Sequence, residues 1–261
     1  MGKFMTPSEI HFVSWERPSI TKLAILTIAR NTNSANYRLV VLDNGSSDAQ
    51  QQMLIDLQND GYIDELILWD QNHGLEVARE YLLRNCTSEF FICADNDCLP
   101  EPLDGTDWVS KLVDLMQKYE DYGAISCRTQ VMIGTGNIFE DESLDITDFP
   151  HPGGSLRIMR TSVTESVGGW EGKPGRGAEE RWICSQLREN GYKTGFATHI
   201  KTLHLFGLKD SDRWGYDKDW APEVTGHSDI SHPALENGDN IEDVKKYSGE
   251  ELANAYLHYK I

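Results

Sequence analysis

The sequence predicts an α/β protein built on a doubly wound, mostly parallel sheet. Strand-like runs alternate with runs of helical spacing in the N-terminal half, and this alternation is typical of repeated βαβ units. Several of the strand-like runs stop at clusters of polar turn formers. With 261 residues, 39% of them hydrophobic, the chain is long and apolar enough to bury one large core.

The first strand is expected over 10–14, an apolar run that ends at Trp15-Glu-Arg-Pro18. A helix over 20–30 follows, with Ser19 as a possible N-cap. The order then repeats, with strands at 37–42, 65–69 and 89–94 and helices at 51–60 and 74–85. Where the periodicity weakens, we expect a helix at 108–119, a strand pair or extended segment at 124–133, a long loop at 134–152, a strand at 156–159 and helices at 162–167 and 179–190.

The composition shifts after Gly207 towards Asp, Trp, Gly and His. We therefore expect one domain over residues 1–207 and an acidic C-terminal extension over 208–261, packed on the domain or involved in acceptor binding. The chain has no run of eighteen apolar residues and no signal-peptide pattern, so we expect no integral membrane segment and a cytoplasmic protein.

The formal net charge is −18, and so negative a surface repels phosphate backbones and anionic lipids, which argues against duplex nucleic acid as a partner. A polyanionic small substrate would need a metal ion or a local cluster of Arg and Lys. The five cysteines are an odd number without CxxC spacing, which predicts buried thiols and suggests neither a disulfide framework nor a zinc site.

Polar residues follow three of the expected strands, in Trp15-Glu-Arg, Asp43-Asn-Gly and Asp95-Asn-Asp97. In a doubly wound sheet, ligands bind beyond the carboxyl ends of the strands, so the three loops should line one crevice. The carboxylates of Asp95 and Asp97 suit Mg²⁺ or Mn²⁺ together with substrate phosphates, although a solvated turn would have the same sequence. Asp43 could accept a hydrogen bond from the imide N–H of a uracil-like base, whereas a plain turn with an N-cap also accounts for its segment.

Six weak motifs in order resemble the family 2 glycosyltransferases of the A-type fold, which transfer a sugar from a nucleotide diphosphate. The motifs are Val13-Ser-Trp-Glu-Arg-Pro18, the run LVVLDNGSSD at 39–48, NHGLEVARE at 72–80 with the DxD at 95–97, Gly153 to Arg160 with Val167-Gly-Gly-Trp170, Gly177-Ala-Glu-Glu180, and Leu203-His204-Leu-Phe-Gly207. The likeness covers roughly residues 9 to 207, and its specificity lies in the order and spacing of the motifs.

The resemblance implies roles for the matching residues. Asp43 would hold the base, and the nucleotide end would be lined by Ser14, Glu16, Gly74 and Arg79. Asp95 would face the ribose or the metal, Asp97 would ligate the metal, and His204 would contact the metal or the diphosphate. The implied cofactor is Mn²⁺ or Mg²⁺, and the implied donor is a nucleotide-diphospho-sugar such as a UDP-sugar.

The resemblance also implies that Glu180 is the catalytic base. The family usually has Asp as the second acid of this pair, and the Glu-Glu found here leaves open whether Glu179 or Glu180 reaches the acceptor. Favourable charge in the first turn of a helix would account for both without any chemistry. Glu80 replaces a common Asn, and its carboxylate would be unfavourable near a diphosphate unless it points away or pairs with Arg79 or Arg84.

The activity implied by the resemblance is inverting, metal-dependent glycosyl transfer to the hydroxyl of a glycan, lipid-linked, protein or other small acceptor. One alternative is a nucleotidyltransferase that acts on a sugar phosphate. It would need a Gly-rich, basic loop after the first strand, and this chain has Ser14-Trp-Glu-Arg-Pro18 there. The other alternative is a non-catalytic carbohydrate- or nucleotide-binding protein.

Overall fold

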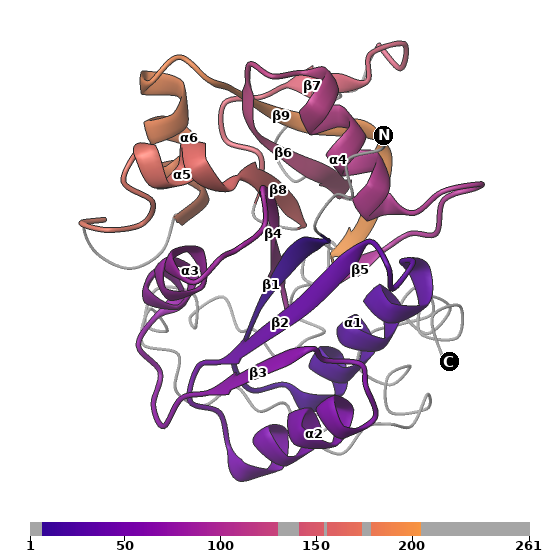
Figure 1. Cartoon of the computed structure of the whole chain (residues 1–261), viewed down its shortest axis with the longest axis vertical. Coiled ribbons are helices and arrows are strands. Elements are labelled where there is room, and N and C mark those ends of the chain that lie inside the picture. The colour runs from indigo at the N-terminus through magenta and orange to yellow at the C-terminus, as the bar shows by residue number, and fades with distance from the viewer. Residues whose placement is uncertain (1–6, 130–140, 154–155, 174–178, 205–261) are drawn as a thin grey trace, which may run out of the picture.

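The computed structural model describes residues 7–129, 141–153, 156–173 and 179–204 (Figure 1). Its first half alternates strands and helices in the order β1 (Ser8–Ser14), α1 (Pro18–Asn31), β2 (Tyr37–Asp43), α2 (Asp48–Asn59), β3 (Glu65–Leu68), α3 (Leu75–Arg84) and β4 (Phe90–Asp95). The second half contains β5 (Cys98–Pro100), α4 (Trp108–Lys118), β6 (Tyr122–Thr129), β7 (Ile146–Asp148), β8 (Arg157–Arg160), α5 (Thr161–Ser166), α6 (Glu179–Glu189) and β9 (Lys193–His204).

Within the described residues, all strands join one sheet in the order β3-β2-β1-β4-β8-β6-β9-β5, with β7 beside β9. β1, β2, β3 and β4 are mutually parallel where they pair, and β6 pairs parallel with β9. β8 runs antiparallel between β4 and β6, and β5 and β7 are antiparallel to β9. The α/β class is therefore confirmed, with a parallel half and a mixed half.

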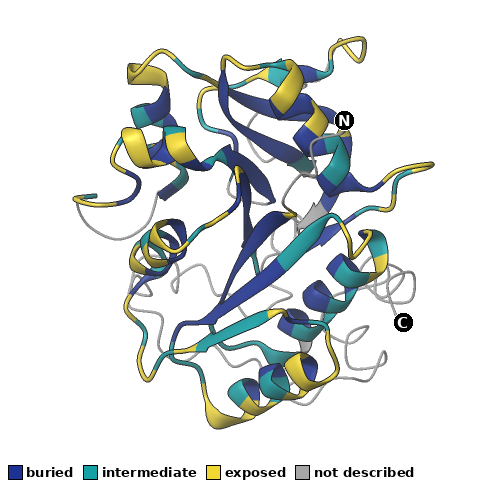
Figure 2. Cartoon of the chain, viewed as in Figure 1, coloured by how far each residue is buried: buried dark blue, intermediate teal, exposed yellow. Residues whose placement is uncertain are grey.

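The sheet is covered on both faces, because successive side chains of a strand point to opposite sides. In β4, Ile92 packs into a cluster with residues of α1, α2 and α4, whereas Phe91 and Cys93 pack with residues of α3 and α6. Figure 1 shows α3, α5 and α6 together on one side of the sheet and α1 and α2 on the other. The strands in the middle of the sheet are almost wholly buried, as Figure 2 shows. A sheet buried on both faces needs apolar residues at nearly every position, which β4 has.

Most expected elements are present, with three additions and one correction. β5, β7 and β9 were not expected, and β7 lies inside the segment 134–152 that was expected to be a loop. Ser19 is not the N-cap of α1, because the helix begins at Pro18 and its N-cap is Arg17. Proline fits the first turn of a helix, since its missing N–H has no partner there. The proposed extension, 208–261, lies outside the described residues.

No helix in the described ranges combines the length and the apolar character that crossing a membrane requires.

The turn after β2 should make stability sensitive to replacement of Gly45. Gly45 has φ +75°, and a Cβ there would come within 2.2 Å of the carbonyl carbon of Gln71. Gly45→Ala should lower the free energy of unfolding by about 3 kcal/mol, since both the backbone conformation and the clash oppose the methyl group. Urea unfolding followed by circular dichroism measures the change.

Gly61→Ala is the matched control, because Gly61 has φ +82° with no atom within 4 Å of the added Cβ. This substitution should lower the free energy of unfolding by about 1 kcal/mol, because only the left-handed backbone conformation opposes it. Equal losses of stability in Gly45→Ala and Gly61→Ala would contradict the close approach of Gly45 to Gln71.

Candidate functional site

The polar loops expected to converge do meet at one edge of the sheet. Ser14 pairs with Asp43 where β1 and β2 end, and Val13 pairs with Asp95 where β1 and β4 end. All three strands are parallel, so their carboxyl ends lie side by side. The segments after β1, β2 and β4 therefore share one edge, which is where ligands bind in open α/β sheets.

Asp43 is fully buried and accepts hydrogen bonds from both neighbouring loops. Ser14 Oγ donates to its Oδ2 at 2.9 Å, Ser46 Oγ donates to the same oxygen at 2.6 Å, and the backbone N–H of Ser46 donates to Oδ1 at 2.9 Å. The side-chain amides of Gln50 and Gln51 donate at 3.4 and 3.2 Å. With five donors around it, Asp43 can bind a base only by exchanging one of them.

Glu16 fastens the loop after β1 to the loop after β2. Its backbone N–H donates to Ser46 Oγ at 2.8 Å, and its carboxylate accepts from the N–H and the Oγ of Ser47 at 2.7 and 2.9 Å. Glu16 and Arg17 both have positive φ, at 51° and 64°. Strained backbone of this kind persists only where the surroundings hold it, and it is concentrated at functional sites.

Gly74 lies at the same edge, at the start of α3, with φ 96°. Its N–H donates to Asn72 Oδ1 at 2.8 Å, and Asn44 Nδ2 donates to the same oxygen at 3.1 Å. The N–H of His73 donates to Asn44 Oδ1 at 2.9 Å. These bonds join the loop after β3 to the loop after β2, so the predicted nucleotide-end residues sit on mutually bonded loops.

The Asp95-Asn96-Asp97 segment offers oxygen ligands for a cation. One ligand atom from each of Asp95, Asp97 and Cys98 lies within 4.8 Å of the others. Arg17 Nη1 lies 3.2 Å from Asp97 Oδ2, and Arg17 Nη2 donates to the side-chain oxygen of Asn96. The carboxylates of Asp95 and Asp97 suit a hard divalent cation such as Mg²⁺ or Mn²⁺, whereas the Cys98 thiol in the same group is a softer ligand.

His204 ends β9 and pairs with Cys98 in the neighbouring strand β5. Its backbone is therefore next to the Asp97 segment, as the motif order implied, while its side chain lies outside the described part of the structure.

A buried ion network connects this edge to the start of α6. Arg79, with 1% of its side chain exposed, donates to Asp95 Oδ1 at 2.6 Å and lies 3.4 Å from Glu179 Oε1. Arg157 and the indole of Trp170 donate to Glu179 Oε2 at 3.1 and 2.8 Å. Burial acts to raise the pKa of Glu179, but Arg157 and then Arg79 outweigh it and hold that pKa below its ordinary value.

The two adjacent glutamates therefore differ in their surroundings. Glu179 precedes the buried Ile183 and Leu187 on one stripe of α6, so its carboxylate points into the protein. Glu180 is half-buried, and among the described residues its carboxylate has no hydrogen-bond or ion-pair partner. The helical period of this segment was the signal that could have separated the two residues.

Glu80 pairs with Arg84, one of the two arginines that the sequence offered as its partner. Its Oε1 accepts from Arg84 Nε at 2.6 Å and its Oε2 accepts from the N–H of Trp170 at 2.8 Å. The carboxylate thereby holds the turn before α6 against α3. A cleft of about 480 Å³ lies beside this contact, lined by His73, Gly74, Glu76, Val77, Glu80, Tyr81, Trp170, Glu171, Gly172 and Lys173.

Sequence reasoning missed three contributors to the site: Arg17, Asn96 and Arg157. Arg17 and Asn96 lay within motifs that had been singled out, but only their neighbours were given roles. Arg157 looked like an ordinary strand residue, and its contact with Glu179 joins residues 22 positions apart. Four guanidinium nitrogens of Arg79 and Arg157, Nε and Nη1 of each, have no hydrogen-bond partner, so the network retains donors for further groups.

The family model for glycosyl transferase family 2 matches residues 15–168. No curated protein sequence matches the chain significantly.

Solved structures share the fold at low sequence identity. GalNAc-T7 with UDP, GalNAc and Mn²⁺ is 14% identical with a TM-score of 0.64, and the match covers 77% of this chain and 43% of that one. The mannosyltransferase PcManGT from Pyrobaculum calidifontis, with GDP-Man and Mn²⁺, is 17% identical with a TM-score of 0.63, covering 97% and 72%. S. aureus TarS 1-349 with UDP-GlcNAc is 11% identical with a TM-score of 0.60, covering 96% and 83%. The chain thus has the A-type glycosyltransferase fold and spans less than half of the GalNAc-T7 chain.

The buried network predicts unequal effects of replacing the two glutamates. Glu179→Gln should lower the free energy of unfolding by about 3 kcal/mol, because it leaves Arg79 and Arg157 buried without their shared counter-charge. Glu180→Gln, one residue along the same helix, should change it by less than about 0.5 kcal/mol. Urea denaturation at neutral pH measures both changes. Equal losses of stability would contradict the conclusion that Glu179, but not Glu180, belongs to the buried ion network.

The same network predicts a dependence on pH. The pKa of Glu179 is lowered in the folded state from its ordinary value of 4.5, so the unfolded chain binds more protons below that pH. The contribution of Glu179 to stability is complete above pH 4.5 and is lost as the pH falls through the folded-state pKa. The stability difference between the parent and Glu179→Gln should therefore shrink on acidification below pH 4.5.

Proposed function

Because the chain belongs to glycosyl transferase family 2, we propose that it transfers a sugar from a nucleotide diphosphate to an acceptor hydroxyl with inversion at the anomeric carbon. The observation that supports this most is the alignment of the ends of β1, β2 and β4, which places Asp43, Asp95 and Asp97 on one edge of the sheet. These three aspartates lie within the matched residues 15–168, whereas the proposed base Glu180 lies beyond them, in α6.

The donor lies along this edge. Asp43 takes the base by exchanging a side-chain donor such as Gln51, which also bonds the carbonyl of Trp69 at 3.0 Å. Ser14, Glu16 and Gly74 line the nucleotide end of the proposed donor site. Arg79 supports the phosphate side, because its buried guanidinium fixes Asp95 and retains a nitrogen, Nη1, without a partner.

Asp97, with Asp95 and His204, is proposed to hold Mn²⁺ or Mg²⁺. A bound divalent cation supplies Lewis-acid stabilisation of charge that develops on the leaving diphosphate. Two structural neighbours were solved with Mn²⁺ and a nucleotide or nucleotide sugar, UDP in one and GDP-Man in the other. Arg17 is placed to exchange between Asp97 and the phosphates, since 16% of its side chain is exposed.

Glu180 is proposed to take the proton from the acceptor hydroxyl as the oxygen forms its bond to the anomeric carbon. The carboxylate of Glu179 is committed to Arg157 and Trp170, so it acts as a positioning residue for the first turn of α6. A single displacement from the face opposite the leaving group inverts the anomeric carbon and needs no protein nucleophile. The acceptor can be a glycan, a lipid-linked sugar, a protein or another small hydroxyl compound.

The two alternative functions differ from glycosyl transfer, one in the product released and the other in having no turnover. A nucleotidyltransferase would release pyrophosphate from a nucleoside triphosphate. A non-catalytic binding protein would hold a nucleotide sugar without hydrolysing or transferring it. Release of a nucleoside diphosphate from a panel of nucleotide sugars with Mn²⁺ present tests the transferase proposal, and release of pyrophosphate from nucleoside triphosphates tests the first alternative.

Replacement of the proposed base should remove turnover and leave donor binding intact. Glu180→Gln keeps the shape of the side chain but cannot accept the proton, so kcat should fall by about 100- to 10,000-fold. The dissociation constant of the nucleotide sugar, measured by calorimetry, should not change.

Glu189→Gln is the matched control, because Glu189 is the exposed last residue of α6, and it should retain full activity. Normal turnover in Glu180→Gln, together with loss in Glu179→Gln, would reassign the base to Glu179.

Donor binding should depend on the cation through Asp97. In the parent protein, calorimetry with a panel of UDP- and GDP-sugars should show binding with Mn²⁺ that weakens strongly in a chelator. Asp97→Asn should bind equally weakly under both conditions, because a neutral amide is a much poorer ligand for a hard cation.

Asp104→Asn serves as the control for this experiment, since Asp104 is an exposed loop residue, and it should keep the response to Mn²⁺. An unchanged response in Asp97→Asn would show that other residues hold the cation.

A further inference from the structure

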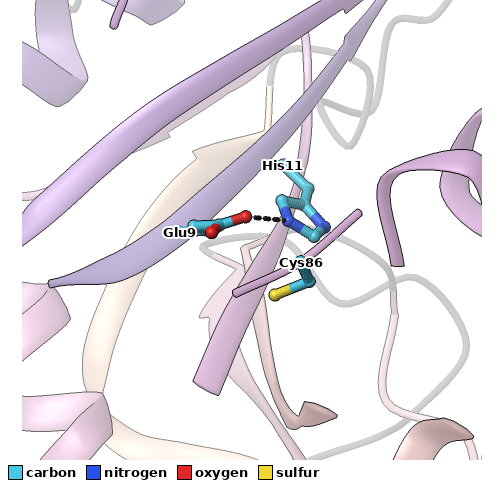
Figure 3. Close-up of side chains that lie close together, drawn as sticks. All are labelled: Glu9, His11 and Cys86. Atoms are coloured by element: carbon cyan, nitrogen blue, oxygen red, sulfur yellow. Dashed lines mark hydrogen bonds and ion pairs between the residues drawn. The ribbon is translucent and has the colours of Figure 1, made fainter. Parts of the chain in front are cut away.

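A second group of ligand-type side chains lies away from the proposed donor site. Glu9 and His11 are two residues apart on β1 and share one face of the sheet, towards α3. Cys86 lies just after the end of α3, in the turn that leads to β4. One ligand atom from each of the three residues lies within 4.8 Å of the others, and Figure 3 shows Glu9 and His11 directed at each other with the Cys86 thiol nearby.

The group is well separated from the strand ends. Val13, the partner of Asp95, follows Glu9 by four residues along β1, which corresponds to about 13 Å at the rise of a β-strand. Glu9 and His11 are only 3% and 2% exposed, while Cys86 is half-buried. The cluster therefore has one partly accessible member through which an ion could enter.

Further hydrogen bonds hold Glu9 and Cys86. Glu9 Oε1 accepts from the N–H and the Oγ1 of Thr87 at 3.0 and 2.7 Å, which leaves Oε2 directed at His11 Nε2, 3.0 Å away. The thiol of Cys86 lies 3.4 Å from Ser88 Oγ and 3.6 Å from Thr161 Oγ1. Outer groups of this kind orient the ligands of metal sites.

Binding an ion in this cluster requires the loss of protons and tolerance of neighbouring charge. Burial acts to raise the pKa of Glu9, but hydrogen bonds from His11 and Thr87 lower it to about 2, so the carboxylate is ionised. Burial lowers the pKa of His11, which favours the neutral imidazole. Its Nε2 donates to Glu9 Oε2, so this nitrogen must give up its proton before it can bind an ion. Arg38, with Nη1 3.7 Å from Glu9 Oε1, and Arg79 are nearby cations that a metal would have to tolerate. Burial raises the pKa of the Cys86 thiol, so binding must displace its proton.

We propose that Glu9, His11 and Cys86 form a zinc site, with one remaining position for water. A carboxylate oxygen, an imidazole nitrogen and a thiolate are all ligands that Zn²⁺ takes in tetrahedral sites. Two ligands at about 2.0 to 2.1 Å from one tetrahedral zinc ion lie about 3.3 Å apart, so the Oε2 to Nε2 separation of 3.0 Å needs to widen only slightly. The ion would tie the turn between α3 and β4 to the first strand and so stabilise the fold.

The test uses the full chain carrying Asp97→Asn, so that the carboxylates at the strand ends contribute less. Zn²⁺ alone should raise the melting temperature, and Co²⁺ should give a thiolate-to-cobalt absorption band. Cys86→Ala in this background should lose the band and the zinc-dependent rise in melting temperature. Cys98→Ala, which removes the other thiol near carboxylates, should keep both.

These outcomes do not depend on the proposed transferase activity, because the experiment does not measure sugar transfer. A cobalt band that survives Cys86→Ala, or no band in the Asp97→Asn protein, would overturn the zinc site. A mild variant, His11→Gln, should retain the Cys86 thiol yet bind Zn²⁺ much more weakly. Equal zinc binding in that variant would also overturn the proposal.

Discussion

The contact on which the site depends most is the buried pairing of Arg79 and Arg157 with Glu179. Arg79 reaches Asp95 at the end of β4 with one nitrogen and lies beside Glu179 with another, so one guanidinium joins the end of β4 to the start of α6. Such a network is costly to desolvate and is strongly destabilised when one member is removed. Its geometry fixes the first turn of α6 relative to the strand ends. The position of Glu180 follows from that turn, because helical neighbours are held by the same backbone.

A second constraint acts on the proposed nucleotide end, where hydrogen bonds join loops that are far apart in the sequence. Asp43 gathers donors from β1 and from its own turn, and Glu16 and Asn44 extend the contacts to the next loops. The positive φ angles of Glu16, Arg17 and Gly74 are tolerated because these bonds hold the backbone. A loop edge that is bonded in this way is pre-organised, which lowers the entropic cost of ordering it around a ligand.

The sequence was sufficient for the parallel half of the fold and for the location of the polar loops. Those elements carry their own signals, namely apolar strands, helical spacing and turn formers at the strand ends. β5 and β7, each three residues long, have no such signal, because they exist through pairing with β9. Contacts between distant residues were equally out of reach: Arg79 with Glu179, and Cys86 with Glu9, depend on how α3 and α6 pack. The separation of Glu179 from Glu180 was within reach, since Ile183 and Leu187 mark the buried stripe of the helix.

The overall charge of −18 makes the local balance at the strand ends decisive. Among the described residues, Arg17, Arg79 and Arg157 pair with Asp97, Asp95 and Glu179. Asp43 is held by uncharged donors, so carboxylates outnumber guanidinium groups by one before Glu16 and Glu180 are included. A diphosphate placed here adds further negative charge in a partly buried setting, where Coulomb repulsion is screened less than in water. Each of these arginines is paired with a carboxylate, so together they offset little of that added charge. The divalent cation proposed at Asp97 would supply the missing positive charge, and for this reason the cation and the donor should bind together.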